Sequence, residues 1–283
     1  MKELSITIIT ICKNAQSTLE KAIESVLYQN YKHIQYIVID GKSSDETPAI
    51  LEKYSERIAK IISEEDSGIY SAMNKGIRYA EGDYIYFLNS DDFLVDEHVI
   101  SDVANFITRH PNSDIVYGNL EIRDINDDRQ VLASPEPSQI LRTLVSGAMH
   151  HQATFAHQRV FEEVGVFKEK YKSAGDYEWW IRVASEESLS KAYYDRVIAS
   201  YFVGGQSSNL TLALQEMFEA QNNAAIYQTN HWLSKRIRIY QEIIKEPQGF
   251  WDLVRIKEEP NEIPGLAKLS FFQKIKRKLR SIF

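Results

Sequence analysis

The chain has 283 residues, of which 43% are hydrophobic and 26% charged, the usual mix for a soluble globular protein with one large domain or two modest ones. Its formal net charge of −7 argues against a general nucleic-acid binder, and its single cysteine, Cys12, excludes an intramolecular disulfide framework. No apolar run reaches the roughly 18 residues that a membrane span needs, so we expect a cytoplasmic protein.

Strand and helix patterns alternate over the first 118 residues. Apolar runs predict strands at residues 4–10, 34–40, 59–63, 83–88 and 114–118, and apolar positions at helical spacing predict helices at residues 16–29, 45–58, 68–80 and 96–110. Ser17 and Glu20 form a capping pair for the first of these helices. Such alternation predicts right-handed crossovers and an α/β fold with a doubly wound, mostly parallel sheet.

The pattern is looser in the rest of the chain. It predicts a hairpin and a loop at residues 119–139, a strand and a short helix at 149–167, a helix at 176–186 and one or two strands at 191–203. A long helix is expected from about Leu210 to Lys245, and the proline and glutamate content of residues 245–265 is typical of a linker.

Polar residues follow four of the predicted strands, at residues 10–14, 40–45, 64–68 and 89–92. In a doubly wound sheet ligands bind beyond the carboxyl ends of the strands, so these stretches form the candidate site. The loop at residues 10–18 contains no glycine, which excludes the Gly-rich turn of a dinucleotide-binding protein, and no P-loop pattern occurs. We interpret Cys12 as a small buried side chain rather than as a reactive thiol.

The stretch YIYFLNSDDFLV ends a predicted buried strand in two adjacent carboxylates, Asp91 and Asp92, which repel each other. A Mg²⁺ or Mn²⁺ ion held by Asp91, with Asn89 and Ser90 nearby, would remove this repulsion and could bridge a diphosphate. The alternative is that Asp91 caps the next helix while Asp92 points to solvent. At the end of the second strand, the Asp40 carboxylate could accept a hydrogen bond from the N3–H of a uracil ring.

Taken together, residues 6–51, 63–92, 150–183 and 201–208 resemble the inverting family-two glycosyltransferases. The likeness covers roughly residues 4–208 and looks closest to the bacterial subgroup that builds exopolysaccharide, O-antigen or glycolipid sugars. It implies a nucleotide-sugar-binding fold of the GT-A type with C-terminal helices. It also implies a nucleotide-diphospho-sugar donor, with UDP favoured, a glycan or lipid-linked acceptor, and Mg²⁺ or Mn²⁺ as the cofactor.

The resemblance assigns roles to the residues at the strand ends. It makes Thr10, Ile11 and Asn14 a wall of the nucleoside pocket and Asp40 the carboxylate that recognises the base. Asp66 and Gly68 would line the uridine, with Asn74 and Lys75 behind them. Asn89, Ser90 and Asp91 occupy the position of the family's DxD motif, in which Asp91 would be the metal ligand. Because Asn89 replaces the first acid, we expect a weaker metal affinity than in a two-aspartate site. Asp45 is expected to cap the following helix.

Asp176, in SAGDYEWWIRV, falls where the family keeps its general base, which takes the proton of the acceptor hydroxyl in an inverting transfer. The alternative is that Asp176 caps the helix that follows it. Glu178 is the weaker candidate for the base, because two residues further on a helix it points away from Asp176. Trp179 and Trp180 could stack on sugar faces, although we expect one of them to lie in the core.

His150 and His151 would point to opposite sides of a strand, so at most one of them can face the site. We expect His151, with Gln152, to contact hydroxyl groups of the donor or the acceptor, and metal ligation is the less favoured role. The loop GGQSS, residues 204–208, could close over the diphosphate with its backbone N–H groups, or its glycines mark only a turn.

The C-terminal residues 266–283 carry six basic side chains and no acidic one, with apolar residues at helical spacing. This pattern is typical of an amphipathic helix attracted to an anionic membrane, here the inner face of the plasma membrane. The alternative is a terminal helix docked on the acidic body. We divide the chain into a donor-binding half at 1–118, an acceptor and catalytic half of the same domain at 119–208, a helical extension and linker at 209–264, and this tail at 265–283.

Two other functions are weighed against a transferase. A non-catalytic subunit that binds sugar nucleotides or carbohydrate is favoured by Asn89 and by Ser71, where the subgroup often carries aspartate. A sugar nucleotidyltransferase usually has a glycine-rich, basic loop after its first strand, and residues 10–18 do not supply one.

Overall fold

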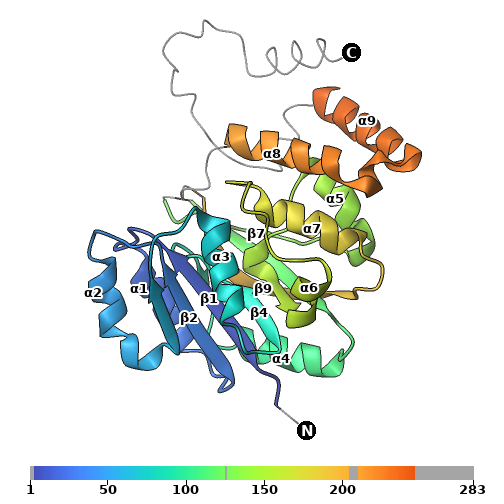
Figure 1. Cartoon of the computed structure of the whole chain (residues 1–283). Coiled ribbons are helices and arrows are strands. Elements are labelled where there is room, and N and C mark those ends of the chain that lie inside the picture. The colour runs from blue at the N-terminus through green and yellow to red at the C-terminus, as the bar shows by residue number, and fades with distance from the viewer. Residues whose placement is uncertain (1–2, 125, 204–209, 246–283) are drawn as a thin grey trace, which may run out of the picture. The chain divides into compact units, whose positions relative to one another are not determined.

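The computed structural model describes residues 3–124, 126–203 and 210–245, and Figure 1 draws its elements. The chain divides into two compact units, Met1–Leu144 with Ala148–Ala224, and Val145–Gly147 with Ala225–Phe283. The first unit holds the described strands and all of the candidate site residues. The predicted loop at 204–208, the linker after Lys245 and the basic tail lie outside the described residues. In the described part, no helix is both long enough and apolar enough to cross a membrane.

A nine-stranded sheet in the order β3-β2-β1-β4-β8-β6-β9-β5 forms the centre of the first unit, and β7 pairs with β6 outside this path. The strands are β1 (Ile6–Cys12), β2 (Ile34–Asp40), β3 (Lys60–Ser63), β4 (Tyr84–Phe87), β5 (Phe93–Leu94), β6 (Ile115–Arg123), β7 (Arg129–Leu132), β8 (Thr154–His157) and β9 (Lys191–Phe202). The two longest ladders, β1 with β2 and β6 with β9, are parallel, whereas β5, β7 and β8 pair antiparallel with their neighbours. This sheet confirms the predicted α/β class.

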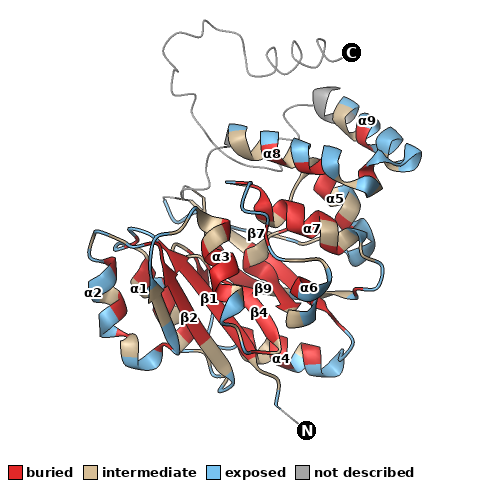
Figure 2. Cartoon of the chain, in the orientation of Figure 1, coloured by how far each residue is buried: buried red, intermediate tan, exposed pale blue. Residues whose placement is uncertain are grey.

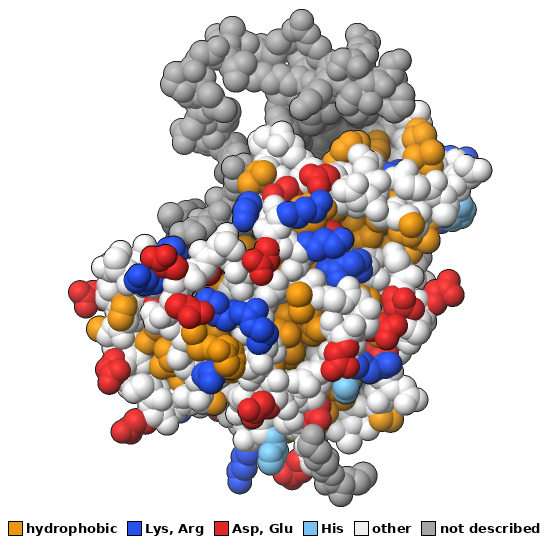
Figure 3. All heavy atoms as spheres, in the orientation of Figure 1, with side chains coloured by type: hydrophobic (Ala, Val, Ile, Leu, Met, Phe, Trp, Pro, Cys, Tyr) orange, Lys and Arg blue, Asp and Glu red, His pale blue; other side chains and the backbone are white. Residues whose placement is uncertain are grey.

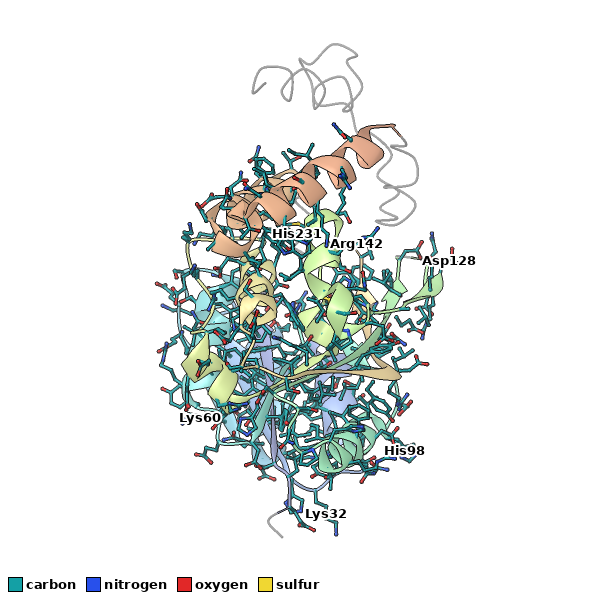
Figure 4. All side chains as sticks on the ribbon, turned by 90° about the vertical axis from the view of Figure 1, so that its right-hand side faces the viewer. Lys32, Lys60, His98, Asp128, Arg142 and His231 are labelled. Carbon is teal, nitrogen blue, oxygen red and sulfur yellow. The ribbon has the colours of Figure 1, made fainter. Side chains whose placement is uncertain are left out.

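The described helices are α1 (Leu19–Leu27), α2 (Thr47–Lys53), α3 (Ile69–Arg78), α4 (Val99–Arg109), α5 (Ile140–Ser146), α6 (Gln158–Glu163), α7 (Gly175–Ser185), α8 (Leu210–Asn223) and α9 (Asn230–Lys245). Of these, α5 lies in a stretch for which the sequence pattern predicts no element. The β6–β7 hairpin is at the predicted place, and Asp128 at its turn points away from the sheet (Figure 4).

Several predicted element boundaries are wrong. The strand predicted at residues 4–10 continues to Cys12, because the last three residues of β1 pair in register with Val38, Ile39 and Asp40 of β2. The helix predicted at 45–58 ends at Lys53, and a short 3₁₀ turn follows.

Two predicted features of the helices are also absent from the described structure. The Ser17 and Glu20 capping pair is not formed: α1 starts after Thr18 without a side-chain cap, and the Glu20 carboxylate accepts a hydrogen bond from the Tyr54 hydroxyl instead, at 2.9 Å. The single long helix expected from Leu210 to Lys245 is two helices. The Thr229 hydroxyl accepts a hydrogen bond from the Trp232 N–H at 3.4 Å, as a capping residue does, and so starts α9 as a new helix.

Helices cover both faces of the parallel part of the sheet, and Figure 2 shows β1 and β4 buried along their length. On one face, Ile6 and Ile8 of β1 share an apolar cluster with residues of α1 and α4. On the other face, Gly76 of α3 lies against Ile9: a Cβ at position 76 would lie 2.5 Å from Ile9 Cγ2, so only glycine allows this approach. This packing holds the carboxyl ends of β1, β2 and β4 at one edge of the sheet.

Candidate active site

The polar strand ends meet where the parallel register predicts. Cys12, the last residue of β1, places its Sγ 3.9 Å from Oδ1 of Asp40, the last residue of β2. Next to them, a Cβ at Gly41 would lie only 2.4 Å from Oδ2 of Asp66, which shows that the Asp66 carboxylate lies against the backbone after β2. The structure therefore brings together the carboxylates of Asp40 and Asp66.

Asp40 is fully buried, and residues of its own chain occupy both of its oxygens. Oδ1 accepts a hydrogen bond from the Ser43 hydroxyl and Oδ2 accepts one from the Ser63 hydroxyl, each at 2.5 Å. The backbone N–H of Ser43 also donates to this carboxylate at 3.2 Å. Because Asp40 is fully buried, the predicted contact with a uracil base would require neighbouring atoms to move aside.

The residues predicted to form the nucleoside wall lie at the end of β1 and in the loop after it. Thr10 is buried, and its hydroxyl accepts a hydrogen bond from the Tyr36 hydroxyl at 3.1 Å, while Ile11 is 8% exposed. Asn14 has a positive φ of 52° and accepts a hydrogen bond from the Ser44 N–H at 2.9 Å, which ties this loop to the loop after β2. The wall is thus held in place by side chains of β2 and its loop.

Asp45 binds the first residue of α2 from the position before the N-cap, which is Glu46 rather than Asp45 as predicted. Its Oδ1 accepts a hydrogen bond from the Thr47 N–H at 3.0 Å, and its Oδ2 accepts one from the Gln16 N–H at 3.2 Å. Desolvation raises the pKa of Asp45, but the hydrogen bonds of Thr47 and Gln16 favour the charged form and together hold this pKa below its ordinary value.

The residues predicted at the uridine site form hydrogen bonds and an ion pair within the protein itself. Asp66 accepts a hydrogen bond from the Gly68 N–H at 3.0 Å, and Gly68 has a φ of 136°, which favours glycine. Asn74 is buried and binds the backbone of Phe167 with both ends of its amide, at 2.8 and 3.0 Å. Lys75 is 6% exposed and pairs with Glu64 at 2.8 Å. Asn74 therefore clamps the segment before α7 to α3, a role that the sequence did not suggest.

Of the two carboxylates after β4, Asp92 is buried and Asp91 is half-buried. Asp92 is 1% exposed, and its Oδ1 accepts a hydrogen bond from the Phe202 N–H at 3.0 Å. Burial raises the pKa of Asp91, and burial together with the charge of Asp91 raises the pKa of Asp92 well above its usual range. The alternative in which Asp91 caps a helix and Asp92 faces solvent is wrong, because β5 follows directly and α4 starts only at Val99.

Unpaired buried polar atoms gather around these carboxylates. Within the described ranges, Asn89 Oδ1, Asp92 Oδ2, Arg123 Nε and His151 Nε2 are buried without a hydrogen-bond partner. Ser200 Oγ and the indole nitrogens of Trp179 and Trp180 are also unpaired in this part of the chain, but the two tryptophans pack in the aromatic core. The charges of Arg123 and His151 act on the pKa of Asp91, which places both side chains near it. Folded proteins rarely leave such atoms unpaired, so the cluster is a candidate place for a ligand or water to supply the missing partners.

The donor atoms here fit a hard divalent cation, although the protein supplies few of them. No group of three or more histidine, cysteine, aspartate or glutamate side chains among residues 3–124, 126–203 and 210–245 is arranged to hold a metal. The Asp91 carboxylate and the unpaired Asn89 Oδ1 are oxygen ligands of the kind that Mg²⁺ and Mn²⁺ prefer, and diphosphate and water oxygens commonly complete such a site.

Asp176 lies at the start of α7, where it joins two elements that are distant in sequence. Its Oδ1 accepts a hydrogen bond from the Tyr70 hydroxyl of α3 at 2.8 Å, and its Oδ2 lies 2.9 Å from Nδ1 of His151. Burial raises the pKa of Asp176, but the hydrogen bond and charge of His151, followed by the bond from Tyr70, outweigh it and keep the pKa below its ordinary value. The capping alternative is wrong, because Ala174 holds the N-cap position of α7.

Glycine at position 175 is what allows this arrangement. A Cβ at Gly175 would lie 2.7 Å from Cδ2 of Tyr70, closer than real side chains approach, so the ring of Tyr70 packs directly on the first residue of α7. From that position the Tyr70 hydroxyl reaches the carboxylate of Asp176. Tyr70 is therefore a site residue that the sequence analysis missed, and its helical position in GIYSAMNKG offered no signal.

The other acidic and aromatic side chains of α7 are structural. Glu178 is buried and pairs with Lys168 at 2.6 Å and with Arg182 at 3.0 Å, so it is not a free carboxylate. Trp179 stacks on Phe161 with ring centroids 5.1 Å apart, and Trp180 is fully buried. Both tryptophans thus lie in the core, whereas we expected one of them there.

His151 opens a 3₁₀ turn, His151–Ala153, rather than lying in a strand, because β8 starts only at Thr154. The prediction that His150 and His151 point to opposite sides of a strand therefore does not apply. The surroundings of the two histidines nevertheless differ. Burial lowers the pKa of His150 to about 4, whereas His151 pairs with Asp176. Gln152 is 4% exposed, and its side chain lies close enough to Asp92 to lower the pKa of that carboxyl.

An α/β sheet with buried carboxylates beyond a central strand and a paired carboxylate facing them is the arrangement of a GT-A glycosyltransferase. The model of the family described as "Glycosyl transferase family 2" matches residues 7–171, more than half of the chain, and the protein belongs to that family. A "PGL/p-HBAD biosynthesis glycosyltransferase" from Mycobacterium bovis is 31% identical over 199 residues, covering 69% of this chain and 76% of that protein. The protein of the same description from Mycobacterium tuberculosis matches equally well.

Solved structures share the fold at lower sequence identity. TarS 1-349 from S. aureus, solved in complex with UDP-GlcNAc, has a TM-score of 0.65 and 16% identity, and the match covers 89% of this chain and 81% of that one. The mannosyltransferase PcManGT from Pyrobaculum calidifontis, in complex with GDP-Man and Mn²⁺, also has a TM-score of 0.65, with 13% identity, covering 100% of this chain and 81% of that one.

Proposed function

We propose that this glycosyltransferase moves a sugar from a nucleoside-diphosphate sugar, with a UDP-sugar favoured, to a hydroxyl of a glycan or lipid-linked acceptor, with inversion at the anomeric carbon. The observation that carries the proposal is the cluster of unpaired buried polar atoms around Asp91 and Asp92, close to the His151–Asp176 pair. It is supported by the family and by the sugar nucleotides named in the related structures.

Asp91, with the carbonyl oxygen of the Asn89 side chain, would hold Mg²⁺ or Mn²⁺. When bound, the ion supplies positive charge for the departing diphosphate. Arg123 already contributes a cation beside Asp91, because its guanidinium donates to the Asp91 backbone carbonyl and its Nε has no partner in the described part of the chain. A neutral residue at position 89 leaves the site with one negative charge fewer than a two-aspartate motif, which predicts weaker metal binding.

We assign the general base that activates the acceptor hydroxyl to Asp176 together with the groups hydrogen-bonded to it. An inverting transfer needs one such base on the side of the sugar opposite the leaving group, and it needs no covalent intermediate. Asp176 is held in its charged form by its neighbours and approaches the Asp91 cluster through His151, whose charge acts on both carboxylates.

Acceptor recognition and cellular location complete the proposal. We assign donor binding to residues 1–118, with Thr10, Ile11, Asn14, Asp40, Asp66, Gly68, Asn74 and Lys75 forming the nucleoside pocket and Asn89 and Ser90 beside the diphosphate. We assign acceptor binding and catalysis to residues 119–208, with His151 and Gln152 near the sugar. A basic tail at 265–283 would bring a cytoplasmic enzyme to an anionic membrane that carries a lipid-linked acceptor.

Calorimetric titration tests the pocket. UDP and GDP are titrated into the full chain with and without Mn²⁺, and the same titrations are made on Asp91→Ala and on the control Asp128→Ala, an exposed aspartate at the β6–β7 turn. We expect UDP binding that depends on Mn²⁺, survives in Asp128→Ala and falls at least about tenfold in Asp91→Ala. Absence of nucleotide binding under every condition would overturn the proposal.

A non-catalytic subunit is the second candidate, and Asn89 in place of an acid is the observation that favours it. Release of UDP from UDP-GlcNAc, or of GDP from GDP-mannose, by the wild-type chain separates the two. Turnover would exclude a non-catalytic subunit, and the anomeric configuration of the product by proton NMR would test inversion.

A further inference from the structure

His151 and Asp176 form a hydrogen-bonded pair in which one ring nitrogen of the histidine has no described partner. The distance from His151 Nδ1 to Asp176 Oδ2 is 2.9 Å, and the other oxygen of Asp176 accepts a hydrogen bond from Tyr70 at 2.8 Å. Both oxygens of this carboxylate are therefore engaged. The other ring nitrogen of His151, Nε2, is buried and has no partner among the side chains and backbone that the structure describes.

The chemistry of the pair decides which ring nitrogen carries the proton. The pKa of Asp176 is held below its ordinary value, so its carboxylate is charged at neutral pH and can only accept hydrogen bonds. His151 must then donate from Nδ1, which leaves a lone pair on Nε2 when the ring is neutral. A carboxylate that orients an imidazole in this way also stabilises the cation that forms when Nε2 takes up a proton.

The surroundings place this lone pair at the reacting end of the proposed site. The charge of His151 acts on Asp91, the candidate metal ligand, so the ring lies near Asp91 while its Nδ1 is 2.9 Å from Asp176 Oδ2. The titratable groups that face the ring are Asp176 from α7, Tyr70 through that carboxylate from α3, Asp91 from the loop after β4, and the adjacent His150.

We propose that Nε2 of His151 is the atom that accepts the proton of the acceptor hydroxyl, and that Asp176 and Tyr70 are positioning residues that act through it. The inference rests on the proposed transferase function and refines the identity of its base. As the O–H proton moves to Nε2, the acceptor oxygen forms a bond to the anomeric carbon. The bond from that carbon to the diphosphate oxygen breaks, and its electron pair leaves with the nucleoside diphosphate. The imidazolium, paired with Asp176, later releases its proton to solvent.

Kinetics with exogenous base test the role of each residue. UDP release from UDP-GlcNAc and GDP release from GDP-mannose are measured for wild type, His151→Ala, Asp176→Asn, Tyr70→Phe and the control His110→Gln, an exposed histidine at the end of α4. We expect kcat of His151→Ala to fall by about 10²–10⁴-fold with little change in the KM of the donor, and added imidazole to restore part of it. Asp176→Asn should lose activity that imidazole does not restore, and Tyr70→Phe should lose a smaller factor.

The protonation of the ring itself can be measured without a substrate. In the full chain labelled with ¹⁵N-histidine, with His151→Asn used for assignment, neutral His151 should carry its proton on Nδ1 and leave Nε2 bare. Asp176→Ala should abolish this preference, whereas His110→Gln should not change it. Thermal unfolding of each variant shows whether the fold is retained, and the ¹⁵N measurement on unmutated protein depends on no variant.

The outcomes separate this inference from the proposed function. If His151→Ala keeps kcat within about tenfold of wild type while Asp176→Asn is inactive, Asp176 is the direct base and the inference fails, but the transferase stands. A proton on Nε2 of the neutral ring overturns the inference in the same way. Absence of nucleotide binding by the wild type overturns the proposed function, and the base assignment with it.

Discussion

The carboxylate of Glu216, on α8, accepts a hydrogen bond from the backbone N–H of Ala174 at 2.9 Å, two residues before Asp176. The backbone N–H groups of Lys172 and Ser173 donate to the same carboxylate, each at 2.8 Å. Glu216 is 8% exposed, so a single buried charge binds three consecutive N–H groups of the segment that leads into α7. In the first unit, α8 thereby fixes the backbone that carries the candidate base.

Replacing Glu216 by glutamine should destabilise the protein and slow catalysis. The amide keeps one acceptor oxygen but turns an N–H₂ group toward backbone donors, so we expect the free energy of unfolding to fall by about 1–3 kcal/mol. Because Asp176 loses its support, kcat should fall more than the donor KM rises.

Glu219→Gln is the matched control: Glu219 lies on the same helix, is exposed and pairs with Lys170 at 2.8 Å. On the face seen in Figure 3, lysine and arginine side chains lie among acidic ones in this way. Denaturant unfolding and steady-state kinetics measure both effects, and equal losses in the two variants would contradict the role given to Glu216.

Adding a single methyl group at Gly175 should disturb the site through Tyr70. A Cβ at this position would lie 2.7 Å from the Tyr70 ring, so Gly175→Ala must move the ring or the start of α7. We expect a loss of stability of about 1–3 kcal/mol and at least a tenfold loss of kcat. A double-mutant cycle identifies the cause, because Gly175→Ala should cost much less in a Tyr70→Ala background, where the ring is absent. Additive effects of the two substitutions would show that the clash lies elsewhere.

The buried carboxylate of Asp92 should make the protein less stable at neutral than at acidic pH. Burial and the charge of Asp91 raise the pKa of Asp92, so the folded state binds this proton more tightly than the unfolded state does. Below the unfolded pKa of about 3.9 both states are protonated, and stability is lost as the pH rises from there through the raised pKa of the folded state. Asp92→Asn keeps the oxygen that accepts from Phe202 and removes the charge.

We therefore expect Asp92→Asn to unfold at higher denaturant concentration than wild type near pH 7.5 without divalent cations. The gain should be about 1.4 kcal/mol for each unit by which the folded pKa is raised, and it should vanish as the pH approaches about 4. Mn²⁺ with UDP should narrow the difference by stabilising the wild type. Asp128→Asn, at an exposed turn, serves as the control. Equal stabilities of wild type and Asp92→Asn near pH 7.5 would contradict this prediction, because neighbouring groups would then compensate the charge of Asp92.

Cys12 should be inert in the folded protein. It is 6% exposed, and burial, followed by the neighbouring charge of Asp40, raises the pKa of its thiol far above the ordinary value. Because the thiolate is the reactive form, we expect a thiol reagent at about pH 8 to modify Cys12 at least about a hundredfold faster in guanidinium chloride than in buffer. Because Cys12 is the only cysteine of the chain, the absorbance of the thiolate that the reagent releases measures the reaction of Cys12 alone. Rapid stoichiometric reaction in buffer would contradict this interpretation.

Local patterns in the sequence were enough to predict the elements of the first half, except the short strand β5, and the edge of the sheet that carries the site. An apolar run such as IQYIVID favours a strand of a parallel sheet, and β2 starts and ends at its predicted residues, Ile34–Asp40. Polar residues directly after such runs had to lie at one edge of a parallel sheet. The same reasoning failed for Asp92, because an acidic residue in a turn is usually solvated and nothing local indicates that this one is buried.

The sequence by itself determined the fold class, the family and the stretches that meet at the carboxyl edge of the sheet. Only the tertiary structure decided that Asp176 lies between His151 and Tyr70, which are 25 and 106 positions away along the chain. It also decided that serine hydroxyls occupy Asp40 and that Glu216 supports the start of α7. The physical reason is that periodicity and capping act over a few residues. Hydrogen-bond partners this far apart are set by the order of the strands and the packing of helices on them, which no local pattern encodes.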